Sequence, residues 1–227
     1  MIEAFILCGG LGTRFREVSN EYPKALAPIG NKLFIDSLIE NLLNQNFSKI
    51  ILGTGYLSTK IEKHISSNYD ERVIISKENT PLGTGGALKN AITKFQTKSI
   101  LVINGDTYIN YQFSKLANFH YKKKADISIL SKEVKNTKEC GIMVTDQNNR
   151  VVEFREKVTK NNTLANVGVY IINTELLKSF KLKFSLENDL FPKICETKRV
   201  YTLTTYKEFF DIGDKEKYTK YLNSKNE

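Results

Sequence analysis

The sequence has few cysteines and no long apolar run. No stretch of the 227 residues approaches the roughly 20 consecutive apolar residues of a membrane span. The first apolar run, residues 4–8, is too short for the hydrophobic region of a signal peptide. Cys8, Cys140 and Cys195 stand alone, without a CxxC spacing, which argues against a zinc site and favours a reducing compartment. We therefore expect a cytoplasmic protein with no membrane partner.

Acidic residues are also scarce relative to basic ones, and the formal net charge is +9. Such a charge raises the question of a nucleic-acid partner. The lysines are spread along the chain, however, and no DNA- or RNA-binding motif accompanies the densest run, Lys122–Lys124. We expect a solvated basic surface that attracts anionic small molecules, and no nucleic-acid partner.

Apolar runs rich in Ile and Val alternate with amphipathic stretches in the first half. They predict strands over 4–8, 49–54, 72–76, 99–105 and 126–131. Helices are predicted from about residue 33, over 85–95, and after a capping box formed by Thr59 and Glu62. This alternation predicts an α/β fold, a Rossmann-like three-layer sandwich with a mixed, mostly parallel central sheet. Ligands of such folds bind beyond the carboxyl ends of the strands, where the glycine-rich segments of this chain fall.

The second half changes in character after about residue 140. Residues 141–157 predict a hairpin around Asn148 and Asn149, and 165–174 and 199–206 predict further strands. Ser185 and Asp214 are predicted helix N-caps. Because only four prolines and no Ser/Gly tract interrupt the chain, we expect one continuous domain over 1–227.

The loop CGGLGTR, residues 8–14, follows the first predicted strand. It is neither a P-loop nor a GxGxxG motif, because no Gly-Lys-Ser/Thr follows and Phe15 stands where the third glycine would be. A turn that exposes successive backbone N–H groups forms a nest for an anion, and Arg14 adds a charged fork. The loop therefore predicts phosphate binding; the alternative is a tight turn with no ligand.

Two further segments carry candidate nucleotide contacts. Pro23 stiffens the backbone before Lys24, a point charge for a leaving phosphate, although an isolated lysine is more often a surface residue. The second glycine-rich loop, 78–88, offers Gly83 and Thr84 for close approach to a flat ligand. Glu78 at its start could accept two parallel hydrogen bonds from guanine, whereas uracil offers one donor on that edge; alternatively it is an exposed strand-end residue.

Carboxylates at strand ends are candidate metal ligands. Asp106 ends a buried strand, a position suited to a divalent cation shared with substrate phosphates. Asp211, after two phenylalanines, is the natural second carboxylate, or else a turn former. Glu156 could accept hydrogen bonds from sugar hydroxyls and Lys157 could neutralise a phosphate, although such neighbours more often form a surface pair.

Seven segments in order together resemble the sugar nucleotidyltransferases, also called NDP-sugar pyrophosphorylases. They are GGLGTR, PKALAPIGNK, PLGTGGAL, NGD, FREK, NVGVY and FFDIGD, and they cover nearly the whole chain. The resemblance implies the fold of the nucleotide-diphospho-sugar transferases, with a nucleotide-binding half at about 1–110 and a sugar-phosphate-binding half at about 111–227. It also implies direct in-line attack of a sugar 1-phosphate on the α-phosphate of a nucleoside triphosphate, with release of pyrophosphate.

The resemblance assigns roles to individual residues. It implies that Arg14 and Lys24 are catalytic and that Asp106 and Asp211 hold Mg²⁺. The nucleotide-binding residues it implies are Leu7, Gly9, Gly10, Gly12, Thr13, Arg14, Lys24, Glu78, Pro81, Gly83, Thr84 and Asp106. The implied sugar-phosphate-binding residues are Gly141, Glu156, Lys157, Asn166 and Val167. Ala25 and Val167 depart from the usual proline and alanine of the family.

Within the family, VSNEYPKALAPIG, GTGYLSTKIEKHI and SLENDLF look most like the D-glycero-α-D-manno-heptose 1-phosphate guanylyltransferases. These use GTP and make GDP-heptose for bacterial surface polysaccharides. The alternative enzymes are a mannose-1-phosphate guanylyltransferase and a transferase that uses another nucleotide or sugar 1-phosphate. The alternative that is not an enzyme is a regulatory nucleotide-sugar-binding protein. The sequence does not decide the oligomeric state, and a homodimer is one possibility.

Overall fold

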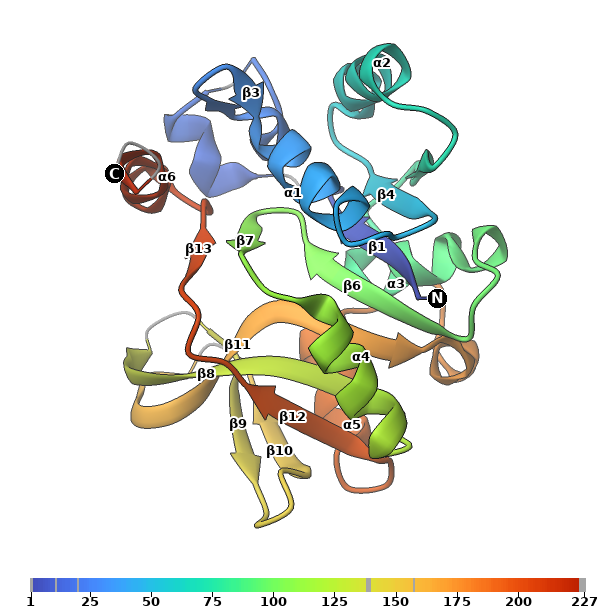
Figure 1. Ribbon diagram of the computed structural model, residues 1–227, viewed down its shortest axis with the longest axis vertical. Helices are drawn as coiled ribbons and strands as arrows, with labels where there is room; N and C mark the ends of the chain where they lie inside the picture. The colour runs from blue at the N-terminus through green and yellow to red at the C-terminus, as the bar shows by residue number, and fades with distance from the viewer. Residues whose placement is uncertain (1, 11, 20, 138–139, 157, 225–227) are drawn as a thin grey trace.

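One mixed sheet organises the fold, as the computed structural model shows (Figure 1). The structure describes residues 2–10, 12–19, 21–137, 140–156 and 158–224. The sheet strands are β1 (Glu3–Leu7), β4 (Ile50–Thr54), β5 (Val73–Lys77), β6 (Ser99–Asn104), β8 (Ile127–Thr137), β9 (Ile142–Thr145), β10 (Val151–Arg155), β11 (Lys160–Asn173) and β12 (Val200–Thr204). Short ribbons pair β2 (Pro28–Ile29) with β3 (Lys32–Leu33), and β7 (Thr107–Ile109) with β13 (Phe209–Asp211).

The strand order places a ligand crevice next to β1. Within the sheet the neighbours run β10-β9-β11-β6-β1-β4-β5, while β8 lies between β11 and β12. Strands β1, β4, β5 and β6 are mutually parallel, and β11 runs antiparallel to β6 and β8. The chain builds outward from β1 through β4 to β5 and then returns to the other side of β1 with β6. The carboxyl ends of β1 and β6 therefore form a topological switch point, where open α/β sheets bind ligands.

Helices cover both faces of the sheet, which confirms the predicted three layers. The α-helices are α1 (Phe34–Leu43), α2 (Ser58–Asn68), α3 (Gly83–Asn90), α4 (Phe113–Lys122), α5 (Phe191–Ile194) and α6 (Lys215–Asn223). Ala4 and Ile6 of β1 pack into a core with α1, α2, α4 and α6, whereas Phe5 packs into a second core with α3 and α5. In Figure 1, α1 and α4 lie toward the viewer and α3 and α5 lie behind. The alternation of side chains along a strand thus supplies both layers.

The predicted capping box on Thr59 is wrong. Helix α2 begins at Ser58, so that Thr59 lies inside it, and the N-cap position is Leu57 with φ of 54°. The chain turns back directly after β4, with the Ser58 N–H donating to the Gly55 carbonyl at 3.1 Å. An N-cap side chain needs an extended backbone, which this tight turn does not allow.

Other local predictions are confirmed. Strands β9 and β10 form an antiparallel hairpin, and Asn149 in its turn has φ of 64°. Ser185 caps a π-helical turn, Leu186–Leu190, by accepting the Asn188 N–H at 3.1 Å, and the helical path continues through α5. Asp214 accepts the Lys217 N–H at 2.9 Å and caps α6.

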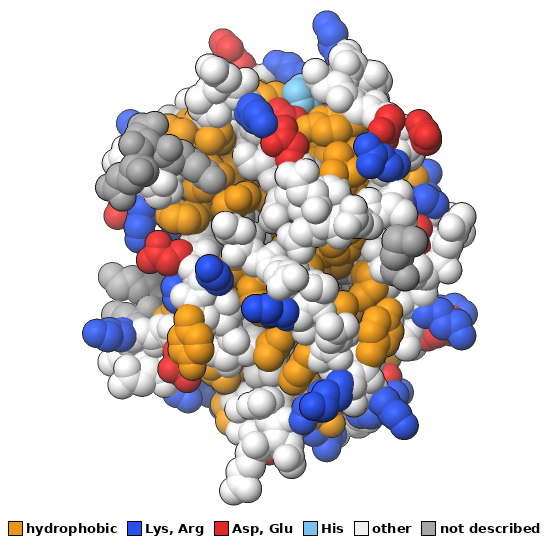
Figure 2. Space-filling model, in the orientation of Figure 1, with side chains coloured by type: hydrophobic (Ala, Val, Ile, Leu, Met, Phe, Trp, Pro, Cys, Tyr) orange, Lys and Arg blue, Asp and Glu red, His pale blue; other side chains and the backbone are white. Residues whose placement is uncertain are grey.

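The charges on the face seen in Figure 2 are dispersed, with acidic side chains interspersed among the lysines and arginines. Among the residues that the structure describes, no helix has the length and apolar character needed to cross a membrane.

Candidate functional site

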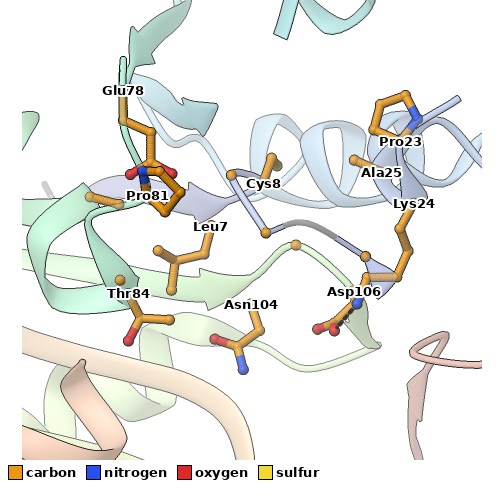
Figure 3. A pocket seen from close by; sticks show the side chains of 16 residues that line it. Leu7, Cys8, Pro23, Lys24, Ala25, Glu78, Pro81, Thr84, Asn104 and Asp106 are labelled. Carbon is orange, nitrogen blue, oxygen red and sulfur yellow. Dashed lines mark hydrogen bonds and ion pairs between the residues drawn. The ribbon is translucent and has the colours of Figure 1, made fainter. Parts of the chain in front are cut away.

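A cavity of about 300 Å³ opens at the carboxyl ends of β1 and β6. The residues that line it are Leu7, Cys8, Gly9, Gly10, Gly12, Pro23, Lys24, Ala25, Glu78, Pro81, Gly83, Thr84, Ala87, Asn104, Gly105 and Asp106. Figure 3 shows Glu78 and Pro81 at one end and the Lys24–Asp106 ion pair at the other, with Asn104 between them. A carboxylate acceptor at one end and a lysine at the other suit a ligand with a polar flat ring and an anionic tail.

The first glycine-rich loop follows β1 and brings backbone to the cavity wall. Gly9, Gly10 and Gly12 line the cavity, and Gly12 has φ of 57°, in the left-handed region that favours glycine. The chain then enters a 3₁₀ turn, Thr13–Glu17, which contains the exposed Arg14. The side chain of Thr13 lies outside what the structure describes. The loop has the backbone exposure that anion binding needs.

Glu78 stands in a slot built by two glycines. It follows β5, and an alanine Cβ would lie 2.6 Å from its Oε1 at Gly9 and 2.7 Å from the same atom at Gly55. The Leu82 N–H donates to Oε2 at 3.3 Å. Burial raises the pKa of Glu78, and the Leu82 hydrogen bond offsets part of this rise. The carboxylate is thus held at the cavity wall with acceptor capacity left for a ligand.

The opposite end of the cavity carries paired charges. Lys24 begins a 3₁₀ turn after Pro23, whose φ of −68° is set by its ring, and Lys24 Nζ pairs with Asp106 Oδ2. Burial by itself raises the pKa of Asp106, but the charge and hydrogen bond of Lys24 outweigh it and hold the pKa below its ordinary value. Burial also raises the pKa of the Cys8 thiol to about 12, so Cys8 is no nucleophile at neutral pH.

The structure brings the backbones of the two predicted metal ligands side by side, with Asp106 in the turn just before β7. Asp211 ends β13 opposite Thr107 of β7, and the Ile212 N–H donates to the Asp106 carbonyl at 2.9 Å. The Asp211 carboxylate is paired with Lys217 at 2.9 Å. Among the described ranges no group of three or more His, Cys, Asp or Glu side chains could hold a metal ion. Two carboxylates fit Mg²⁺, which commonly takes one or two protein oxygens and completes its shell with phosphate and water.

The predicted sugar-phosphate residues gather around β11. The Asn166 N–H donates to the Gly141 carbonyl at 2.8 Å, and an alanine Cβ at Gly141 would lie 2.6 Å from Glu156 Oε2. The pairing of β11 with β8 shifts register between Asn166 and Tyr170, a bulge of the kind common beside active sites. The Val167 side chain is buried in the core, so only its backbone could reach a ligand. Lys157 lies outside the described residues.

Several lining residues escaped the sequence reasoning. Asn104 was overlooked although it directly precedes Gly105 and Asp106 at a strand end, and its Oδ1 is buried without a hydrogen-bond partner among the described residues. It joins the cavity to β11, because an alanine Cβ at Gly168 would lie 2.8 Å from Asn104 Nδ2. Gly55, which borders Glu78 but is not itself a lining residue, also carried no local signal, since its role depends on where Glu78 folds.

Comparisons with known proteins agree on one family. The family described as nucleotidyl transferase matches residues 3–226. The D-glycero-alpha-D-manno-heptose 1-phosphate guanylyltransferase of Aneurinibacillus thermoaerophilus is 37% identical over 222 residues, 96% of each chain. Its namesake from Campylobacter jejuni is 33% identical and covers 97% of this chain and 99% of its own. The crystal structure of HddC from Yersinia pseudotuberculosis is 33% identical with a TM-score of 0.89 over 99% of both chains; its complex with GMP-PN, also covering 99% of both, is 33% identical and gives 0.87.

Proposed function

The chain belongs to the nucleotidyl transferase family, and from that premise we propose that it transfers the GMP group of GTP to D-glycero-α-D-manno-heptose 1-phosphate. The products are GDP-D-glycero-α-D-manno-heptose and pyrophosphate, for bacterial surface polysaccharide synthesis. The observation that most supports this proposal is the cavity at the switch point of β1 and β6, with Glu78 and Lys24 at opposite ends. Relatives named heptose 1-phosphate guanylyltransferases, similar over nearly their whole length, support this choice of substrates.

The proposed reaction needs alignment and charge neutralisation more than proton transfer. An oxygen of the sugar 1-phosphate attacks the α-phosphorus of GTP in line, and the bond to the departing pyrophosphate breaks without a covalent enzyme intermediate. The nucleophile is already an anion, so the barrier lies mainly in bringing two polyanions together. Lys24 and Arg14 hold the triphosphate and stabilise the charge that develops on pyrophosphate. The backbone of Gly9, Gly10 and Gly12 lines the phosphate path.

In this proposal we assign guanine to the Glu78 end of the cavity. The carboxylate accepts from N1–H and from the exocyclic amine, while Pro81, Gly83 and Thr84 border the ring. Asp106 and Asp211 would hold Mg²⁺, which supplies positive charge against the phosphates of both substrates.

The second half of the chain is proposed to bind the sugar 1-phosphate. Gly141, Glu156, Asn166 and the backbone of Val167 border this site, and Lys157 is assigned to the phosphate by its place in the FREK motif. The whole chain, 1–227, acts as one domain in this proposal, since β6 and β11 pair within one sheet. Three cysteines without a CxxC spacing suit a reducing cytoplasm.

The decisive experiment measures pyrophosphate release for the four nucleoside triphosphates, each combined with a panel of hexose and heptose 1-phosphates. We expect the highest kcat/KM for GTP with the heptose 1-phosphate. A higher value with mannose 1-phosphate would replace the sugar assignment. Absence of release with every pair, together with tight binding of a nucleotide sugar, would favour a regulatory binding protein instead.

A further inference from the structure

A chain of side-chain hydrogen bonds joins the second glycine-rich loop, 78–88, to strand β11, and Glu187 lies at its centre. Thr84 Oγ1, at the start of α3, donates to Glu187 Oε2 at 2.6 Å, and Ser185 Oγ donates to the same oxygen at 3.0 Å. The Tyr170 hydroxyl donates to Glu187 Oε1 at 3.3 Å. A second hydrogen bond holds the Thr84 side chain in place, because its Oγ1 accepts the Leu186 N–H at 2.8 Å.

The hydrogen-bonded chain continues from Tyr170 to Asn166, which also lies in β11. The Tyr170 hydroxyl accepts from Asn166 Nδ2 at 2.7 Å, and Asn166 Oδ1 accepts the Gly168 N–H at 2.8 Å. Both ends of the Asn166 amide are therefore bound within the protein, and its plane is set. Among the residues that the structure describes, the second amide hydrogen on Nδ2 has no acceptor, so it remains for an outside acceptor.

Stability alone does not explain these polar groups. Tyr170 is fully buried, and its ring packs 5.0 Å from that of Phe191, centroid to centroid. Phenylalanine at 170 would fill the same space without placing a hydroxyl in the core. Buried polar groups and ion-bearing networks are often no more stabilising than apolar groups of the same shape, and they make geometry specific. Here the polar chain lies between the two halves of the candidate site, where geometry decides the reaction.

We propose that Tyr170 and Glu187 are positioning residues for the transfer. Glu187 holds the first turn of α3 through Thr84 and, through Tyr170, orients the free amide hydrogen of Asn166 toward an oxygen of the sugar 1-phosphate. This inference rests on the proposed function, because it assigns Asn166 to that substrate. Neither Tyr170 nor Glu187 touches a reacting atom.

The first test compares Tyr170→Phe with a matched variant, Tyr69→Phe. The Tyr69 hydroxyl also donates to a carboxylate, Asp36 Oδ1 at 2.6 Å, but this bond lies outside the hydrogen-bonded chain from Thr84 to Asn166. In Tyr170→Phe we expect KM for the sugar 1-phosphate to rise about 5- to 30-fold, the effect of one buried hydrogen bond, with KM for GTP within about twofold of wild type. Tyr69→Phe is expected to leave both KM values unchanged.

The second test is a double-mutant cycle that adds Glu187→Gln. If the two residues act through one chain, the double variant should be no more impaired in KM for the sugar 1-phosphate than the worse single variant. Additive effects, or a Tyr170→Phe enzyme that loses thermal stability while its KM for the sugar 1-phosphate stays at the wild-type value, would overturn the proposal. The wild-type enzyme distinguishes failure of the proposed function from failure of this inference. If wild type releases no pyrophosphate, the proposed function is refuted, and this inference with it. If wild type is active and Tyr170→Phe leaves KM for the sugar 1-phosphate unchanged, only the positioning role of Tyr170 and Glu187 is refuted.

Discussion

Replacing Gly9 with alanine should weaken recognition of guanine without touching Glu78 itself. The new Cβ would lie 2.6 Å from Glu78 Oε1, whereas ordinary contacts of a Cβ begin near 3.4 Å. Gly55 lies against the other side of the same carboxylate, since a Cβ there would lie 2.7 Å from Glu78 Oε1. The carboxylate must therefore move by several tenths of an ångström away from its place at the cavity wall.

The expected fall in kcat/KM for GTP follows from the hydrogen bonds between Glu78 and guanine. A shift of this kind lengthens an N–H···O bond of about 2.9 Å beyond the useful range. A hydrogen bond to a charged group is worth about 1.5–3 kcal/mol, so the loss of one bond to guanine lowers kcat/KM for GTP about 10- to 150-fold. UTP offers only one donor on that edge, so its kcat/KM falls less, and the GTP-to-UTP ratio drops.

The assay is pyrophosphate release with GTP and with UTP at a fixed sugar 1-phosphate. Gly10→Ala is the matched control, because a Cβ there meets no atom within 4 Å and any contact with phosphates affects both nucleotides alike. Glu78→Gln should lower the same ratio, since the amide places a donor where guanine also donates. A folded Gly9→Ala enzyme with the wild-type GTP-to-UTP ratio would refute Glu78 as the guanine reader.

Further predictions concern charge, pH and backbone. Asp106→Asn and Asp211→Asn should each lower kcat at least about 100-fold with an unchanged far-UV circular dichroism spectrum; near-wild-type turnover in either would remove that residue from the metal site. Burial lowers the pKa of His120 to about 4, so between its ordinary pKa of 6.5 and pH 4 the unfolded chain binds a proton that the folded chain does not. Stability should fall by up to about 3 kcal/mol as pH drops through that window, and urea unfolding of His120→Gln should show a shallower loss. Gly168→Ala places a Cβ at φ of 75° and 2.8 Å from Asn104, and should cost about 2 kcal/mol in urea unfolding, whereas an unchanged midpoint would argue that the bulge relaxes freely. A duplex DNA or RNA gel shift at about 150 mM salt should show no complex, and a retained complex would contradict the absence of a nucleic-acid partner.

Local pattern determined much of the fold. The apolar runs placed β1, β4, β5 and β6 to within a residue or two. The signal is strongest for β1, β4 and β6, because a strand buried on both faces must be apolar at nearly every position. The side-chain caps at Ser185 and Asp214 were also readable, since a cap depends only on residues within one turn. The cap expected at Thr59 failed because the preceding turn, and not the side chain, sets the start of α2.

The joining of distant residues depended on tertiary structure. From the sequence, residue type and the family resemblance predicted Asp106 and Asp211 as a pair, and the pairing of β7 with β13 is what makes them neighbours. The path from Thr84 through Glu187 and Tyr170 to Asn166 had no sequence signal. Its first two steps cross between elements that only core packing brings together, and its last step lies within β11, where the pairing with β8 shifts register. A sequence specifies which groups lie at element ends, but only the assembled sheet and its helices decide which of those groups face one another.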